Sequence, residues 1–239
     1  MNNQTLGIIT LLLSFTGYLL AWKAFSINKI QQGILFLIAS GIILQIFSSC
    51  DLFLHTWDER YHALVAKNLL KHPLIPTLYD TPVLSYQFQE WWANHIWLHK
   101  QPVPLWLMAG SMKVFGISEI AIRIPSIIAS SLCIFFTYYI GAYLLNRKIA
   151  FFAAMLLSFN GLILALTGGR TASDHYDILF LFFIELGVFF TIKFIKTKKN
   201  LYNIACGISI GLAILTKWLP ALIVIPIWLL LVIDSNQFN

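Results

Sequence analysis

Two neighbouring carboxylates, Asp58 and Glu59, follow a long apolar run and precede Arg60. A carboxylate at such a place can act as a general base that takes the proton from an attacking hydroxyl group. The same position also suits helix capping, because Asp is favoured at a helix start and its charge is stabilised there by the helix dipole. From the residues alone, both interpretations of Asp58 stay open.

A second polar tract holds His95, His99 and Lys100. If it is helical, the two imidazoles lie four residues apart on one face, a spacing that can hold a divalent metal ion. They are equally consistent with ordinary polar residues at a membrane interface. Lys100 can pair with a lipid phosphate, but a lysine that only extends its charge into water would occupy the same place.

A short polar segment at 168–177 joins two apolar runs and supplies Arg170, Asp174 and Asp177. These residues could contribute an arginine and two acids to the same site as Asp58. The alternative interpretation is an ordinary hydrophilic turn in which Asp177 caps the following helix.

Two further ionisable residues, Glu185 and Lys217, stand within or between apolar runs. An ionisable group inside a membrane span is energetically costly, so Glu185 marks either a functional site or a polar contact with a neighbouring helix. Lys217 either extends its charge to the membrane surface or contacts an anionic head group.

The composition sets the environment in which these residues act. The chain has 239 residues, of which 59% are hydrophobic and 11% charged, and its mean hydropathy is +0.77. Its apolar runs are continuous and approach the roughly 20 residues that cross a bilayer as a helix, unlike the short alternating segments of a membrane β-barrel. The sequence therefore predicts an all-α, polytopic transmembrane helical bundle.

Spanning helices are predicted at 6–22, 33–54, 121–145, 149–167, 177–194, 201–216 and 218–234. Three connections, at 23–32, 146–148 and 193–200, contain lysine or arginine and no acid. By the positive-inside rule these face the cytoplasm. The alternation of spans then places 51–120 and 168–176 outside, with most of the acids and all six histidines. Because the charges sort by side of the membrane, the net charge of +6 does not indicate nucleic acid as a partner.

The predicted outer loop, 51–120, should lie along the membrane rather than cross it. Residues 58–70 form an amphipathic pattern, and 86–98 contains three tryptophans, which favour the headgroup level. The run at 103–115 is short and begins beside two prolines, so a re-entrant or surface-lying helix is expected. We therefore expect interfacial helices in this loop.

These residues together resemble the polytopic C-type glycosyltransferases, which include aminoarabinose transferases acting on lipid A and dolichyl-phosphate-mannose protein mannosyltransferases. The resemblance runs over about residues 51–226. It rests on five pieces in order: Trp57-Asp58-Glu59-Arg60-Tyr61; His99-Lys100-Gln101-Pro102-Val103-Pro104-Leu105-Trp106; Phe115-Gly116-Ile117-Ser118-Glu119 leading to Arg123-Ile124-Pro125-Ser126; Arg170-Thr171 with Asp174 and Tyr176-Asp177; and Gly211-Leu212-Ala213-Ile214-Leu215-Thr216-Lys217.

The resemblance implies an enzyme that takes a sugar from a polyprenyl-phosphate carrier and transfers it, with inversion, to a lipid A-like or protein acceptor outside the membrane. It makes Asp58 the catalytic base or acceptor-positioning carboxylate, with Glu59 beside it. Asp177, or alternatively Asp174, resembles the second active-site acid. A bacterial inner (plasma) membrane is the expected location.

The same resemblance implies contacts to substrates and cofactors. Lys100 is the expected contact to the carrier phosphate, and further substrate-binding residues are Arg60, Tyr61, Arg170 and Lys217. His99 stands where the family supplies a metal ligand or another polar group. A divalent metal ion thus stays open as a cofactor, since the family includes metal-dependent and metal-independent members.

The chain also departs from the family pattern. Gln101 replaces a proline, and the segment 1–32 adds a helix and a cytoplasmic loop before the usual first helix. Family members are longer, so 1–239 is expected to be one transmembrane domain of a truncated or split enzyme. Two other hypotheses are a truncated, inactive membrane protein that binds a prenyl-phosphate lipid, and a transporter that uses Glu185 as its coupling group.

Overall fold

The computed structural model describes residues 3–87, 89–171 and 174–237. Within these ranges the chain forms ten α-helices and two short 3-10 turns, and no strand. The helices are α1 (Asn3–Ser26), α2 (Ile30–Ser48), α3 (Asp58–Leu69), α4 (Pro102–Phe115), α5 (Glu119–Leu144), α6 (Arg147–Ser158), α7 (Gly161–Thr167), α8 (Asp174–Thr197), α9 (Asn200–Lys217) and α10 (Val224–Gln237); the turns are η1 (Trp91–Ala93) and η2 (Leu219–Ile223). The predicted all-α architecture is confirmed.

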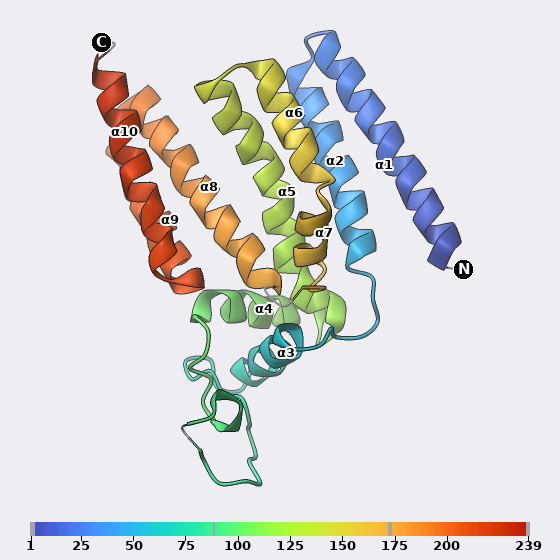
Figure 1. Cartoon of the computed structure of the whole chain (residues 1–239), viewed down its shortest axis with the longest axis vertical. Coiled ribbons are helices and arrows are strands. Elements are labelled where there is room, and N and C mark those ends of the chain that lie inside the picture. The colour runs from blue at the N-terminus through green and yellow to red at the C-terminus, as the bar shows by residue number, and fades with distance from the viewer. Residues whose placement is uncertain (1–2, 88, 172–173, 238–239) are drawn as a thin grey trace.

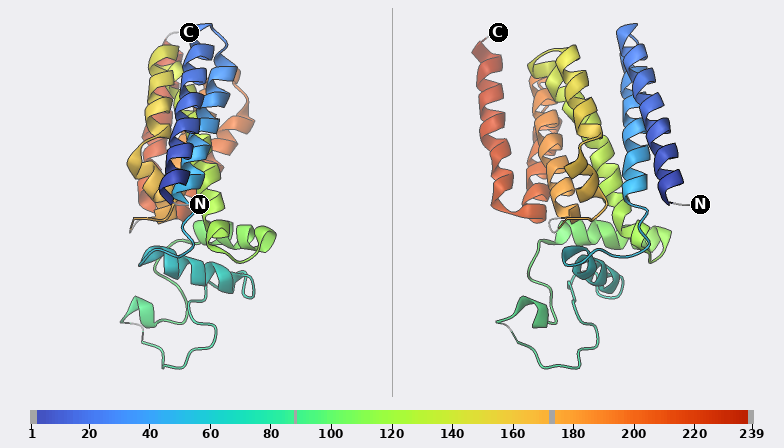
Figure 2. Two further views of the ribbon diagram at one scale, coloured as in Figure 1. Left: turned by 90° about the vertical axis from the view of Figure 1, so that its right-hand side faces the viewer. Right: turned by 45° about the vertical axis from the view of Figure 1, so that its right-hand side comes forward.

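The long helices run side by side as one bundle, whereas α3 and α4 lie across one of its ends (Figures 1 and 2). Four helices, α1, α2, α5 and α8, are long and apolar enough to cross a membrane, and the bent pair α6 and α7 makes a fifth if it counts as one span. The predicted spans at 201–216 and 218–234 are present as α9 and as η2 with α10, but they fall outside that group of long apolar helices.

The span predicted at 149–167 is present as the two helices α6 and α7 rather than as one straight helix. The chain bends by 51° between α6 and α7. At the break, Asn160 Oδ1 accepts hydrogen bonds from the backbone N–H groups of Leu162 and Ile163, at 3.0 and 3.2 Å. A side chain that caps a new helix start in this way takes the place of the helical backbone bonds, so one helix ends and another begins.

Charge divides between the two ends of the bundle as the sequence predicts. The connections α1–α2, α5–α6 and α8–α9 lie together at one end (Figure 1), and they carry Lys29, Arg147, Lys148, Lys198 and Lys199. The opposite end holds α3, α4, the end of α7 and the start of α8. The candidate acids on the long loop and those at the start of α8 therefore share one end of the molecule.

The long loop is less helical than the sequence predicts. Helix α2 ends at Ser48, not near residue 54, and the described residues of the next tryptophan-rich stretch, 86–87 and 89–98, contain the turn η1 and no α-helix. Backbone bonds from Leu78 N to His95 O and from Trp97 N to Pro76 O, both 2.7 Å, pair this stretch with the chain before it. His95 and His99 therefore do not share a helical face, so the argument for a metal site from their spacing fails.

Local signals explain how α4 and α5 are set at this end. Pro102 occupies the first position of α4, where its missing N–H costs nothing, and Gly116 follows the helix with a φ of 84°, which favours glycine. Ser118 then caps α5 by accepting a bond from Ala121 N at 3.3 Å. A buried apolar cluster that includes Val65, Leu105 and Trp97 packs the interfacial helices together beneath the bundle.

Candidate active site

A buried ion pair between Arg123 and Glu59 lies at the centre of this end. Arg123 Nε and Nη2 donate to the two carboxylate oxygens of Glu59, at 2.7 and 3.1 Å. The remaining donors of Arg123 reach the backbone oxygens of Ser49 (2.9 Å), Asp51 (2.6 Å) and Phe53 (2.8 Å). One guanidinium on α5 thus fixes both the start of α3 and the linker that leads to it.

Three more residues close around the Glu59 carboxylate. His175 Nε2 lies 3.3 Å from Glu59 Oε1, and its Nδ1 lies 2.8 Å from Ser126 Oγ. The backbone N–H of His55 donates to Glu59 Oε2 at 2.6 Å. Gly169 has a φ of +70°, and a Cβ there would lie 2.4 Å from Glu59 Oε1. Only glycine fits this close approach, so α3, α5, α8 and the end of α7 all meet at one carboxylate.

Glu59 is only 1% exposed. Burial by itself raises the pKa of a carboxyl, but the hydrogen bonds from His175 and Arg123 outweigh it and lower the pKa of Glu59 below its ordinary value. The carboxylate is therefore held as an anion with both oxygens engaged.

Its neighbour Asp58 has a different environment. Lys100 Nζ lies 3.2 Å from Asp58 Oδ2, and the two side chains are 29% and 16% exposed. The N-cap position of α3 is occupied by Trp57, with no side-chain capping bond, so Asp58 forms this ion pair in place of the capping role that the sequence left open. Lys100 also lies 5.8 Å above the ring of Tyr176.

A second acid–lysine pair lies close by, between Asp177 in the first turn of α8 and Lys217 at the end of α9. Tyr176 connects the two pairs, because it precedes Asp177 in the chain, lies under Lys100, and donates from its hydroxyl to Gln101 O at 2.8 Å. Both pairs therefore lie at the end of the bundle where α8 begins.

Arg170 belongs to a third pair on the same end of the molecule. Its Nη2 lies 2.9 Å from Asp51 Oδ2, and the same carboxylate oxygen lies 3.1 Å from His55 Nε2. The backbone of Asp51 is in turn bonded to Arg123, so this exposed pair is joined to the buried one.

The aromatic part of the long loop holds Tyr61 and His99. The ring of Tyr61 stacks on Trp97 at 5.8 Å, and the imidazole of His99 stacks on Trp91 at 4.6 Å. Burial and the charge of Lys100 lower the pKa of His99. No group of three or more His, Cys, Asp or Glu side chains that could hold a metal ion occurs within 3–87, 89–171 and 174–237.

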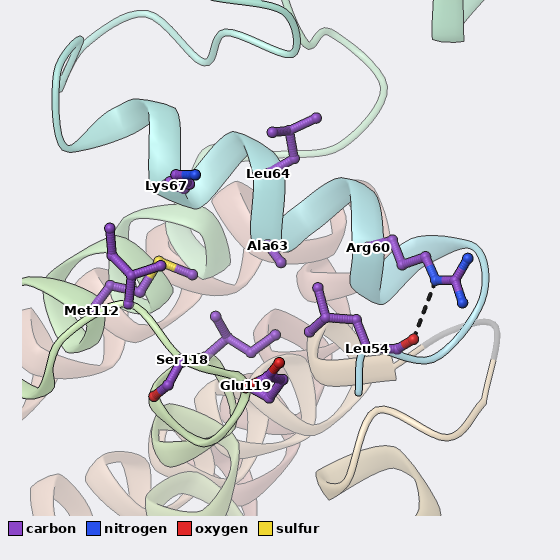
Figure 3. Close-up of a pocket in the computed structure, with 10 residues that line it drawn as sticks. Leu54, Arg60, Ala63, Leu64, Lys67, Met112, Ser118 and Glu119 are labelled. Carbon is purple, nitrogen blue, oxygen red and sulfur yellow. Dashed lines mark hydrogen bonds between the residues drawn. The ribbon is translucent and has the colours of Figure 1, made fainter. Parts of the chain in front are cut away.

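Arg60, another predicted site residue, contacts a different part of the chain. Arg60 donates from Nε to Leu54 O at 3.2 Å and lines a separate cleft with Lys67 and Glu119 (Figure 3). The side chain of Asp174 lies outside the part of the chain that the structure describes.

Sequence reasoning did not single out Arg123, His175 and Asp51 as parts of the site. Arg123 carried a usable signal, since it is a charged residue inside a run predicted to span the membrane, where an ionisable group needs a partner. Nothing in the spacing of His175 and Glu59, 116 residues apart, shows that they meet.

Glu185 lies between two helices of the bundle. Thr137 Oγ1 on α5 donates to Glu185 Oε1 on α8 at 2.8 Å. This hydrogen bond is the polar contact with a neighbouring helix that was one of the two interpretations of Glu185 from the sequence. It provides no support for a coupling group in a transporter.

Comparison with known proteins supports a family assignment. The family model described as dolichyl-phosphate-mannose-protein mannosyltransferase matches residues 99–238. An uncharacterized protein of Aquifex aeolicus is 29% identical over 172 residues, which cover 71% of this chain and 31% of that protein. The chain thus spans about a third of the length of this curated relative. No solved structure matches. The match covers more than half of a chain rich in membrane-spanning helices, and the protein is therefore an integral membrane protein of the dolichyl-phosphate-mannose-protein mannosyltransferase family.

Proposed function

We propose that this protein transfers a sugar from a polyprenyl-phosphate carrier to a lipid or protein acceptor, at the end of the bundle that carries α3 and α4. The observation that carries the proposal is the pair of acid–lysine contacts, Asp58–Lys100 and Asp177–Lys217, which lie at the same end of the bundle; Tyr176 contacts Lys100 and precedes Asp177 in the chain. Such an arrangement supplies both a proton acceptor and cations for a phosphate.

The two lysines are the proposed contacts for the donor. Lys100 and Lys217 are both partly exposed, so an incoming phosphate can reach their ammonium groups. A phosphate that pairs with Lys100 competes with Asp58, because both anions are attracted to the same compact ammonium charge. Donor binding would then free Asp58 to act on the acceptor.

The proposed reaction is a single displacement. Asp58 accepts the proton of the acceptor hydroxyl, whose oxygen forms a bond to the anomeric carbon of the sugar. The bond between that carbon and the carrier phosphate breaks on the opposite face, which inverts the configuration. The polyprenyl phosphate leaves with the electron pair, and Lys100 and Lys217 neutralise its charge. No step requires a metal ion.

Glu59 serves in this proposal as a positioning residue rather than as a second base. Both of its oxygens are engaged by Arg123, His175 and His55. It holds the start of α3 against α5 and α8, and with it the backbone of Asp58. Asp177 is the second active-site acid, and Arg170 with Asp51 borders the site.

The distribution of charges supports an extracytoplasmic site. The three basic connections gather at the end of the bundle opposite the site. By the positive-inside rule this distribution favours a site on the extracytoplasmic face, and under this proposal the membrane is a bacterial inner membrane.

The test uses membranes that contain the whole chain, supplied in turn with radiolabelled polyprenyl-phosphate mannose, glucose or aminoarabinose. Asp58→Asn should lower the rate of transfer by about 10²- to 10⁴-fold, the usual effect of losing a general base. The matched control is Asp80→Asn, because Asp80 lies in the same loop but pairs with Lys71 and His72. Transfer that depends on the chain but is unchanged in Asp58→Asn would refute the proposal.

A further inference from the structure

A separate cleft of about 260 Å³ lies between α3, the end of α4 and the start of α5 (Figure 3). Its apolar lining includes Met112 and Ile122, and its charged residues are Arg60 and Lys67 on α3 and Glu119 on α5. Arg60 and Lys67 are seven residues apart, which is two turns or about 10 Å along the helix. Arg60 donates to Leu54 O and extends away from Lys67 (Figure 3), so the two cations reach a single group between them once the Arg60 side chain turns along the helix.

The surroundings of the cleft are those of a surface in contact with lipid. Val114 and Phe115 at the end of α4, and Ile117 at the cleft itself, are 74%, 62% and 60% exposed. Adjacent exposed apolar side chains at the end of a membrane bundle indicate contact with a bilayer rather than with water. The charged residues of the cleft then lie where lipid headgroups begin.

We propose that this cleft binds one bilayer phospholipid whose headgroup carries both a phosphate and a primary amine, as phosphatidylethanolamine does. The phosphate pairs with Arg60 and Lys67, and the ammonium pairs with Glu119 across the cleft. The acyl chains run along Ile117 and the apolar lining. This site is distinct from the proposed transfer site, where Asp58 pairs with Lys100.

The signs of the charges select this headgroup. A purely anionic headgroup would satisfy the two cations but would place negative charge near Glu119. A choline headgroup has no N–H group to donate to the carboxylate, since its nitrogen carries four carbons. Only a headgroup with a phosphate and an N–H-bearing cation matches both sides of the cleft.

The test measures lipid retention by the whole chain. The protein is purified in detergent, freed of lipid, and titrated with phosphatidylethanolamine, phosphatidylcholine or phosphatidylglycerol, and bound lipid is counted by native mass spectrometry. Phosphatidylethanolamine should bind most tightly. Replacing Arg60 and Lys67 together by Gln should weaken its binding about tenfold or more, as expected for lost hydrogen bonds to charged groups. Glu119→Gln should abolish the preference over phosphatidylglycerol.

Lys113→Gln is the matched control, because Lys113 is an exposed cation of α4 outside the residues that line the cleft. It should bind lipid like the unmodified protein. Equal binding of the three lipids, or an equal loss in Lys113→Gln, would overturn the proposal. Displacement of phosphatidylethanolamine by an equal amount of polyprenyl phosphate would also overturn it, by assigning the cleft to the carrier. If circular dichroism shows that the Arg60 and Lys67 variant has lost helix, the headgroup preference of Glu119→Gln decides alone.

Discussion

The consecutive carboxylates Asp58 and Glu59 lie in opposite environments. Glu59 is 1% exposed and engaged by Arg123, His175 and His55, whereas Asp58 is 16% exposed in its side chain and pairs with Lys100 at the edge of the loop. Successive residues of a helix point about 100° apart, so Glu59 faces the bundle and Asp58 faces the edge of the loop. Two identical functional groups thus receive a structural and a proposed catalytic task from their neighbours alone.

The two carboxylates should contribute differently to the free energy of unfolding. An ion pair buried in low dielectric costs desolvation, and removing one partner leaves the other charge unpaired, at a cost of roughly 3–5 kcal/mol. A partly exposed pair contributes only about 0–1 kcal/mol. Substitutions at Glu59 should therefore act on stability, and substitutions at Asp58 on chemistry.

The largest stability effect is expected for Glu59→Gln. It leaves the guanidinium of Arg123 buried without its counter-charge, so the free energy of unfolding in detergent should fall by about 3–5 kcal/mol. The measurement is denaturant unfolding followed by near-ultraviolet circular dichroism. Glu90→Gln, a change of the same kind elsewhere in the loop, should shift stability by less than about 0.5 kcal/mol. Equal effects of the two substitutions would show that the buried Glu59 is no more important for stability than another acid of the loop.

Gly169→Ala should also disturb the contacts of Glu59, because Gly169 packs closely against the Glu59 carboxylate. Alanine at a φ of +70° costs about 1–2 kcal/mol, and its Cβ would lie 2.4 Å from Glu59 Oε1, so the carboxylate must shift. We expect a loss of about 2–3 kcal/mol in thermal or denaturant unfolding. Gly207→Ala is the opposite control, because a Cβ in that part of α9 meets no atom within 4 Å, and it should gain about 0.5–1 kcal/mol. A neutral Gly169→Ala would show that Glu59 is not confined there.

The sequence was sufficient for the outline of this architecture. Long apolar runs predict membrane helices because lipid leaves the backbone no other partner, and the basic connections predict which loops lie together. Asp58, Lys100 and Asp177 could be found because each is a polar residue next to an apolar run in a recognisable motif. Their grouping at one end follows from the alternation of spans.

The pairings themselves could not be read from the sequence. Glu59 meets Arg123 and His175 across 64 and 116 residues, and only the packing of α3 against α5 and α8 brings them together. The bend at Asn160 was missed because the apolar run continues through it, whereas the side chain of Asn160 caps a new helix start. The tryptophans of 86–98 predict only a place at the membrane surface, and they do not show that His95 and Trp97 pair with the backbone at 76–78.

Acidic pH should weaken the ion pair between Glu59 and Arg123. The pKa of Glu59 is lowered in the folded protein, so its contribution to stability is complete above the unfolded value of about 4.5 and is lost as the pH falls through the folded value. The difference in stability between the unmodified protein and Glu59→Gln should therefore shrink below about pH 4.5. Asp80, whose pKa is lowered by Lys71 and His72, titrates in both proteins and cancels. A difference that stays constant down to pH 3 or grows with acid would contradict this account.

The smallest stability effect is expected for the partly exposed ion pair between Lys100 and Asp58. Lys100→Gln removes a partly exposed pair with Asp58 and should change the free energy of unfolding by less than about 1 kcal/mol. Transfer from a polyprenyl-phosphate sugar should nevertheless fall, with the larger change in KM if the lysine holds the carrier phosphate. Lys71→Gln, another exposed pair in the loop, should leave both quantities unchanged. A loss of several kcal/mol in Lys100→Gln would make this pair structural.

The most direct test compares Asp58→Asn and Glu59→Gln by their transfer rate per folded molecule, at a temperature where both remain folded. Asp58→Asn should keep the stability of the unmodified protein and lose transfer by about 10²-fold or more. Glu59→Gln should lose stability and should lower transfer less than Asp58→Asn does, since it acts only through the position of Asp58. Full activity in Asp58→Asn together with abolished activity in folded Glu59→Gln would contradict the assignment of the two carboxylates.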